Sequence, residues 1–246
     1  MKPRTEALLR LLAVQASYTY ERMAGIGVGH AAAPLLRDVF ATRSVRERRE
    51  AVARSADFFN SHPYLAGVAV GAEVKAEQDG VPGPVISRLR TALSGPLGAL
   101  GDQLIWAGWV PALIGIGLIA APWAGLWAIV GIVLVHNVLR LWLTAWGLDL
   151  GLREGLRVGG ALQRSWLPRG AVEAQRVAAF AVGAALPVVA WQVLQHASRG
   201  EVGATVGVAL VGVVLSVVPR TRVRVSGLRF GLLLVGVALL ALGGLR

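Results

Sequence analysis

A stretch without charge constrains the fold of this chain more than any other feature. Residues 103–139 are 37 consecutive residues that include no Asp, Glu, Lys or Arg. As one helix they would be about 55 Å long at 1.5 Å per residue, whereas the hydrocarbon core of a bilayer is only about 30 Å thick. The segment must therefore turn back on itself. We expect the turn at residues 120–123, because Pro122 removes a backbone donor and disfavours helix in the residue before it.

The composition of the whole chain indicates a membrane protein. Its 246 residues are 55% hydrophobic and only 16% charged, whereas soluble domains have roughly 45–50% apolar and about 25% charged residues. The net charge of +11 could suit nucleic acid, but the basic residues flank apolar segments, as the positive-inside rule predicts. The sequence contains no cysteine, which excludes disulfides, a cysteine nucleophile, a phosphocysteine and thiolate-held metals.

The charge distribution divides the chain into regions. Residues 1–103 hold 13 Lys and Arg and 10 Asp and Glu, whereas residues 104–246 hold 12 and 4. The expected fold is an all-α integral membrane protein. Its regions are an amphipathic and re-entrant helical part over residues 1–103, an apolar helical hairpin over 104–146, a basic cytoplasmic connector over 147–176 and three transmembrane helices over 177–246. The three apolar segments 177–198, 202–219 and 230–245 are each roughly long enough to cross a bilayer.

The positive-inside rule also predicts the orientation. The short segment 219–224 carries three arginines, so it is expected in the cytoplasm. Counting outward from it makes 199–203 an external turn and places the N-terminus inside and the C-terminus outside a multi-pass protein of the bacterial cytoplasmic membrane. The first apolar run, residues 7–16, is interrupted by Arg10 and lacks a cleavage site. We therefore expect a surface helix on the membrane or a partner, and no cleavable signal peptide.

Other segments of the first region have distinct patterns. Residues 43–57 interleave both signs of charge, which is typical of a helix with a solvated face; recognition of lipid headgroups or of a partner is the alternative. Residues 63–72 are apolar but too short to span, which favours a re-entrant segment.

Residues 94–102 are rich in Gly and Pro, which predicts a broken helix tip with Asp102 at the start of the next helix. Glu73 and Glu77 share one helical face, expected to be solvated or, second, to contact a partner.

Four motifs occur in order over residues 17–155. Residues 20–23 are YERM, and residues 57–64 are DFFNSHPY. Residues 95–102 are GPLGALGD with Trp106 four residues on, and Asn137 and Arg140 precede Gly147 and Gly151. These motifs resemble E-R-M, E-F-F-N-T-H-P-Y, G-P-L-A-G-x-G-D-x-x-x-W and N-x-x-R…G…G-x-x-x-G of the IID membrane subunit of the mannose-type (mannose/fructose/sorbose) sugar phosphotransferase system. The sequence departs from the family at Gln103, where Pro or Ser is expected, and at Asp57, which replaces Glu.

The resemblance implies a subunit that works with other proteins. A IID subunit forms, with a IIC subunit, the membrane unit that binds and translocates a hexose-type sugar, while IIA and IIB proteins carry the phosphate on histidine. The resemblance therefore implies a non-catalytic subunit of a phosphotransferase complex, in contact with membrane lipid and assembled as a trimer of IIC–IID pairs. We expect no catalytic residue, cofactor, metal or nucleic acid. A non-transporting membrane scaffold or regulatory receptor with the IID fold is the alternative.

Sugar binding needs convergent donors and acceptors, since buried polar groups left unpaired cost about 1–3 kcal/mol each. Asn60, His62, Asp102 and Gln103 are the candidate substrate-binding residues, because they offer such groups near the proposed bends. For His62 the alternative is a buried histidine that fixes a turn, and for Asp102 it is a helix N-cap. The other histidines, His30, His136 and His196, are expected in packing or at interfaces.

A second group of motif residues is expected to serve structure or subunit contact. Arg140 is expected to snorkel to the cytoplasmic interface, with gating as the alternative. Glu21 and Arg22 are expected to form an inter-subunit ion pair or to remain solvated. The glycines of residues 25–29 predict close helix packing, not a dinucleotide loop. The full group is Glu21, Arg22, Phe59, Pro63, Gly95, Pro96, Gly101, Trp106, Asn137 and Arg140.

Overall fold

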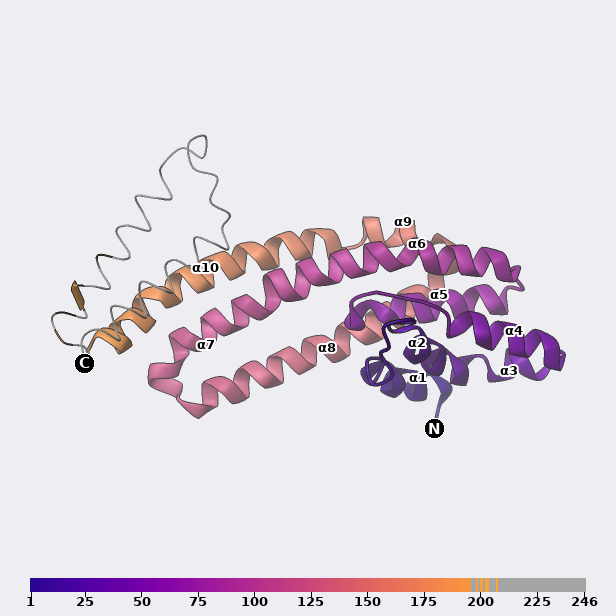
Figure 1. The fold of residues 1–246 in the computed structure, drawn as a ribbon, viewed down its shortest axis with the longest axis horizontal. Coiled ribbons are helices and arrows are strands. Elements are labelled where there is room, and N and C mark those ends of the chain that lie inside the picture. The colour runs from indigo at the N-terminus through magenta and orange to yellow at the C-terminus, as the bar shows by residue number, and fades with distance from the viewer. Residues whose placement is uncertain (196–197, 199, 201, 204–206, 208–246) are drawn as a thin grey trace, which may run out of the picture. The chain divides into compact units, whose positions relative to one another are not determined.

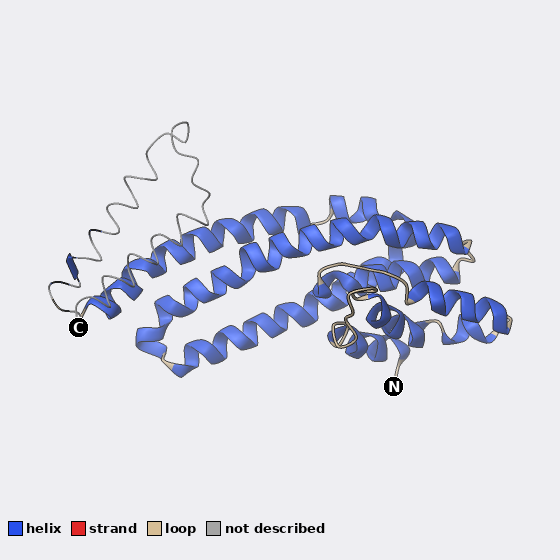
Figure 2. Cartoon of the chain, in the orientation of Figure 1, coloured by secondary structure: helices blue, strands red, loops and turns tan. Residues whose placement is uncertain are grey.

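The computed structural model describes residues 1–195, 198, 200, 202–203 and 207. Within this part every regular element is helical, which confirms the predicted all-α class (Figure 2). The segment 230–245, the basic loop 219–224, His196 and most of 199–219 lie outside the described residues. The chain forms two compact units, Met1–Ala185 and Leu186–Arg246, and the sites described below belong to the first.

The N-terminal part of the chain consists of short helices, and the longest helices, among them α8 and α10, follow it (Figure 1). The short elements of the N-terminal part are α1 Pro3–Leu12, α2 Gly25–Ala32, η1 Ala33–Leu35, α3 Arg37–Ala41, α4 Val45–Ser55, η2 Pro63–Leu65 and α5 Ala66–Gln78. They are followed by α6 Gly83–Gly101, the π-helix η3 Asp102–Trp109, α7 Val110–Ala124, α8 Leu126–Glu154, η4 Gly155–Arg157, α9 Val158–Arg164 and α10 Leu167–Leu194.

The N-terminal helices form a packed cluster. The predicted charged helix is α4, which begins with a capping box: the Ser44 side chain accepts from the Glu47 N–H and the Glu47 carboxylate accepts from the Ser44 N–H. α1 buries Ala7 and Leu11 in the core, where they are 0% and 2% exposed, whereas Leu9 on the same helix is 54% exposed. A short amphipathic helix buries its apolar stripe against the nearest apolar surface, which here belongs to the chain itself.

Glycine packing in α2 confirms the prediction for residues 25–29. A Cβ added to Gly25 would overlap the Asp57 carbonyl oxygen, and one added to Gly27 would overlap that of Val14. The missing side chains therefore let two backbone segments approach α2 directly.

The central element is α5, which is buried along almost its whole length. It packs against α8 through glycines on both helices: a Cβ on Gly71 would overlap the Leu148 carbonyl oxygen, and one on Gly151 would overlap that of Val68. Residues 63–72, expected to be re-entrant, form η2 and the first turns of a buried helix that continues to Gln78.

The long apolar hairpin exists, but it is longer than predicted and turns later. Residues 83–124 form one helical run, and α8 returns from Leu126 to Glu154. The turn lies at Gly125, whose φ of +51° suits a residue without a Cβ, while Pro122 is accommodated near the end of α7. The predicted break at residues 94–102 is wrong as well: the helix continues through Pro96, and Asp102 begins a π-helix instead of capping a new helix.

Two helical runs are long and apolar enough to cross a membrane, namely Gly83–Ala124 and Leu126–Gln192. The expected connector over residues 147–176 lies inside the second run. It consists of the end of α8, η4, α9 and the beginning of α10, so it is helical and not an open loop. The arginines of this connector are compatible with helix, because Arg favours helix as strongly as most apolar residues do.

Candidate functional site

His62 lies where the second and third motifs meet. It is 2% exposed, and a Cβ added to Gly101 would overlap its side chain. Its ring packs edge-on against Tyr64, with centroids 4.9 Å apart, and lies 5.8 Å from the Trp106 ring. Gly101 and Trp106 of the third motif therefore both contact this histidine of the second.

The hydrogen bonding of His62 determines its tautomer. The backbone N–H of Tyr64 donates to Nδ1 at 3.3 Å, at the start of η2. A neutral ring must then carry its proton on Nε2, which is buried without a hydrogen-bond partner in the described structure. His62 is thus a buried histidine that accepts from the turn at Tyr64 but is not fully satisfied, since Nε2 next to Gly101 and Trp106 has no partner in the described structure.

The imidazole of His62 should remain neutral at physiological pH. Burial lowers its pKa from 6.5 to about 4, and the nearby charge of Asp102 opposes this shift only partly. Since the unfolded chain binds the proton more readily, the free energy of unfolding should fall as the pH drops from 6.5 to about 4. An NMR titration of the ring carbons should show His62 unprotonated at pH 5. His62→Asn can keep an acceptor for the Tyr64 N–H but cannot titrate, so it should flatten this part of the pH dependence. A His62 ring that titrates near 6.5 in the NMR experiment would contradict the prediction.

A second aromatic pair links the site to α8. Tyr64 Oη lies 2.9 Å from His136 Nε2, and the Arg140 guanidinium lies 5.4 Å from the centre of the Tyr64 ring. The same guanidinium donates to the Leu12 carbonyl at 2.6 Å, an acceptor left free at the end of α1. This hydrogen bond holds the half-buried Arg140 side chain against the end of α1. Sequence reasoning missed Tyr64 and treated His136 as packing, although both stand inside or beside a motif.

The other three substrate candidates, Asn60, Asp102 and Gln103, are exposed, the first in a loop and the other two on the π-helix. Asn60 accepts from the Tyr18 hydroxyl at 3.0 Å, and its N–H donates to Ser94 Oγ at 3.2 Å on α6. Asp102 and Gln103 lie on the π-helix, a form of helix that occurs frequently at functional sites.

Other motif residues do not join this site. Asn137 is exposed on α8 and donates to the Val133 carbonyl of its own helix at 2.8 Å. Gly95 and Pro96 are exposed on α6, and a Cβ on Gly95 would meet nothing within 4 Å. Pro63 begins η2 directly after His62.

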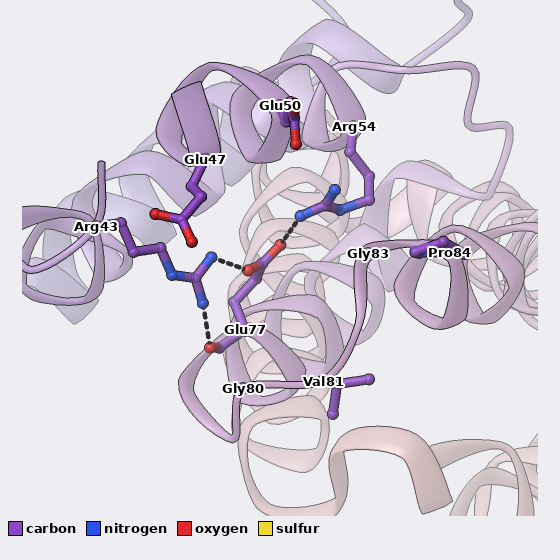
Figure 3. Close-up of a pocket in the computed structure, with 9 residues that line it drawn as sticks. All are labelled: Arg43, Glu47, Glu50, Arg54, Glu77, Gly80, Val81, Gly83 and Pro84. Atoms are coloured by element: carbon purple, nitrogen blue, oxygen red, sulfur yellow. Dashed lines mark hydrogen bonds and ion pairs between the residues drawn. The ribbon is translucent and has the colours of Figure 1, made fainter. Parts of the chain in front are cut away.

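Glu73 and Glu77 are not solvated, contrary to the prediction. They are 0% and 2% exposed, because α5 buries the face that they share. Arg90 and the Ser55 hydroxyl bind Glu73. Around Glu77, Arg43 and Arg54 pair with the two carboxylate oxygens at the edge of a cavity of about 410 Å³ (Figure 3).

The Glu73–Arg90 pair supports the aromatic motif. Arg90 is 3% exposed, donates to the Asp57 carbonyl at 3.1 Å and lies 5.3 Å from the ring centre of Phe59, which is fully buried. The sequence contained one signal for this arrangement, namely two carboxylates one helical turn apart that follow the apolar run 66–72. Such carboxylates need cationic partners if the helix is buried.

The fold and the site together define a helical membrane protein whose polar motifs lie next to a π-helix. This π-helix is part of a long apolar helical run. Residues 1–223 match the model of the family described as PTS system mannose/fructose/sorbose family IID component. The chain belongs to this family.

Relatives with assigned functions are similar over part of the chain. The mannose-specific EIID component of Escherichia coli K12 is 26% identical over 63% of this chain and 58% of its own length. The fructose permease IID component of Bacillus subtilis is 25% identical over 58% and 53%, and the sorbose-specific EIID component of Klebsiella pneumoniae is 28% identical over 58% and 54%. The alignments therefore span somewhat more than half the length of these relatives.

Solved structures share the fold. A chain of the mannose transporter ManYZ, solved in complex with a microcin, aligns with a TM-score of 0.59 at 23% identity, covering 74% of this chain and 68% of that one. A structure described only as a membrane protein aligns with a TM-score of 0.66 at the same identity and coverage.

Proposed function

We propose that this chain is the IID subunit of a mannose-type phosphotransferase permease. With a IIC subunit it would form the membrane unit that binds a hexose-type sugar and passes it inward for phosphorylation by IIB, which receives the phosphate from IIA. The observation that carries this proposal is the family match over residues 1–223. The meeting of the second, third and fourth motifs around His62 and Tyr64 supports it.

The sugar-contacting groups in this proposal are Asn60, His62, Asp102 and Gln103. Asp102 and Gln103 are exposed beside Trp106, which is 58% exposed and offers an aromatic face. His62 adds a buried donor without a partner in the described structure, and such a donor gains most from a ligand acceptor. Discontinuities in membrane helices are common places for substrate sites, and the π-helix supplies one here.

The complex would lie in the bacterial cytoplasmic membrane, with the N-terminus inside and the C-terminus outside. Two apolar helical runs and the membrane transporters of the same fold support a multi-pass protein. The excess of basic residues around the apolar segments supports the orientation. A trimer of IIC–IID pairs is the assembly that the family resemblance implies.

Sugar uptake by cells that co-express the chain with IIC, IIB and IIA from the same genome tests the proposal. Asp102→Ala combined with His62→Ala should reduce uptake about a hundredfold or more, since each lost polar group removes about 1–3 kcal/mol of binding. Co-purification with IIC should persist. Asp79→Ala is the control, because this carboxylate is exposed and pairs only locally with Lys75. Uptake by the double variant equal to that of the control would refute the site, and failure of the unmodified chain to support uptake of any hexose would refute the function.

A further inference from the structure

Tyr64 lies between His62 and helix α8 and contacts both. Its backbone N–H donates to His62 Nδ1 at 3.3 Å, and its ring packs edge-on against the imidazole with centroids 4.9 Å apart. Its hydroxyl forms a hydrogen bond with Nε2 of His136 on α8, at 2.9 Å. One side chain therefore connects the buried histidine of the candidate site to a residue 72 positions farther along the chain.

Helix α8 holds the Tyr64 ring at a second point. Arg140 lies one helical turn after His136, on the same face of α8, and its guanidinium lies 5.4 Å from the centre of the Tyr64 ring. Arg140 is itself anchored by the hydrogen bond to the Leu12 carbonyl at 2.6 Å. The hydroxyl and the ring of Tyr64 are thus both held by α8, so the ring cannot turn without losing one of these contacts.

The neighbours of His62 determine where its free nitrogen points. Nδ1 is occupied by the Tyr64 N–H, and Nε2 is buried without a hydrogen-bond partner in the described structure. The ring packs against Tyr64 and lies 5.8 Å from the Trp106 ring, and Gly101 approaches so closely that a Cβ there would overlap the imidazole. A change in the orientation of Tyr64 would therefore change the direction of the His62 Nε2–H.

The direction of a donor determines how much it contributes to binding. Hydrogen bonds weaken steeply when the angle at the hydrogen falls below about 120°. Binding groups are therefore effective when their neighbours hold them within about 0.5 Å and 10–20° of the required geometry. A ring fixed before the ligand arrives also loses less conformational freedom on binding. Contacts that fix the His62 ring thus increase affinity without touching the ligand.

We propose that Tyr64 is a positioning residue of the sugar site. Its hydrogen bond to His136 holds the ring against which the His62 imidazole packs, and thereby aims Nε2–H at an oxygen of the sugar. This inference rests on the proposed function, in which His62 contacts the sugar. It adds Tyr64 and His136 as residues that act through His62.

The kinetics of sugar uptake, in cells that co-express IIC, IIB and IIA, test this role. Tyr64→Phe removes only the hydroxyl and should raise KM for the sugar about three- to tenfold, the effect of one hydrogen bond, with little change in the maximal rate. His136→Leu should raise KM equally, and the two changes together should add nothing further, because they remove the same bond. His136→Gln keeps a donor and an acceptor and should retain most of the affinity. Tyr20→Phe is the matched control, because Tyr20 is 93% exposed.

A second background shows whether Tyr64 acts through the histidine. In a chain that carries His62→Ala, Tyr64→Phe should leave KM unchanged, because no imidazole remains to be aimed. An equal rise of KM in both backgrounds would overturn the proposal, since Tyr64 would then act on the sugar without His62. An unchanged KM for Tyr64→Phe in the unmodified background would overturn it as well.

NMR of the purified full-length chain tests the positioning without any sugar. Nitrogen shifts of the His62 ring should show one sharp species with its proton on Nε2, and Tyr64→Phe should broaden or split these signals while circular dichroism stays unchanged. A purely structural role of the hydroxyl would lower stability and leave the ring signals sharp, which would overturn the proposal. If the unmodified chain supports uptake of no hexose, the proposed function fails, and the ring signals alone decide whether Tyr64 positions His62.

Discussion

Gly151→Ala is expected to destabilise the chain by about 2 kcal/mol or more, as overpacking against rigid neighbours does, despite the gain of about 1 kcal/mol in helix propensity. The added Cβ would overlap the Val68 carbonyl oxygen and come close to the Ala72 nitrogen, both in the backbone of α5. Backbone atoms of a packed helix cannot rotate away as a flexible side chain can. α5 and α8 would have to separate, and the buried face of α5 would lose its contacts.

A matched substitution on the same helix isolates this effect. Gly131 also lies in α8, and a Cβ there would meet nothing within 4 Å, so Gly131→Ala should be neutral or slightly stabilising. Unfolding in a denaturing detergent, followed by circular dichroism, gives the two free energies. Equal stability of the two variants would show that α5 and α8 are not held together at this glycine.

Glu73→Gln is expected to cost about 3–5 kcal/mol, the range for removing one partner of a buried ion pair. The variant keeps the shape of the side chain but leaves the Arg90 guanidinium, 3% exposed, without its counter-charge. Because Arg90 also binds the Asp57 carbonyl and packs on Phe59, the loss should extend to the second motif. The free energy of unfolding should therefore fall.

Two comparisons show whether burial is the cause. Glu50→Gln removes one partner of the exposed pair with Arg46 and should change stability by less than about 1 kcal/mol. The double variant Glu73→Leu with Arg90→Leu removes both charges and should recover part of the loss. A double variant less stable than Glu73→Gln would mean that the pair stabilises the fold by attraction, and that the uncompensated charge is not the main cost.

Local chemistry made several features of this protein predictable. An uncharged segment longer than the thickness of a bilayer requires a hairpin, and the YERM, DFFNSHPY and GPLGALGD motifs indicate the family. The turn expected at residues 120–123 lies at Gly125, because a proline near the end of a helix can be accommodated whereas a positive φ selects glycine. The break expected at residues 94–102 is absent, because α6 continues through Pro96 and passes into a π-helix at Asp102.

Residue types and their spacing along the chain were sufficient for the class, the helical hairpin, the family and the placement of Glu73 and Glu77 on one face. What covers that face depends on how distant helices pack. The tertiary structure buried both carboxylates against arginines from three segments of the chain, brought His136 to Tyr64 over a separation of 72 residues and directed Arg140 to the end of α1. The physical reason is that helical periodicity relates neighbours along the chain, whereas burial and ion pairing depend on which distant helix packs against them.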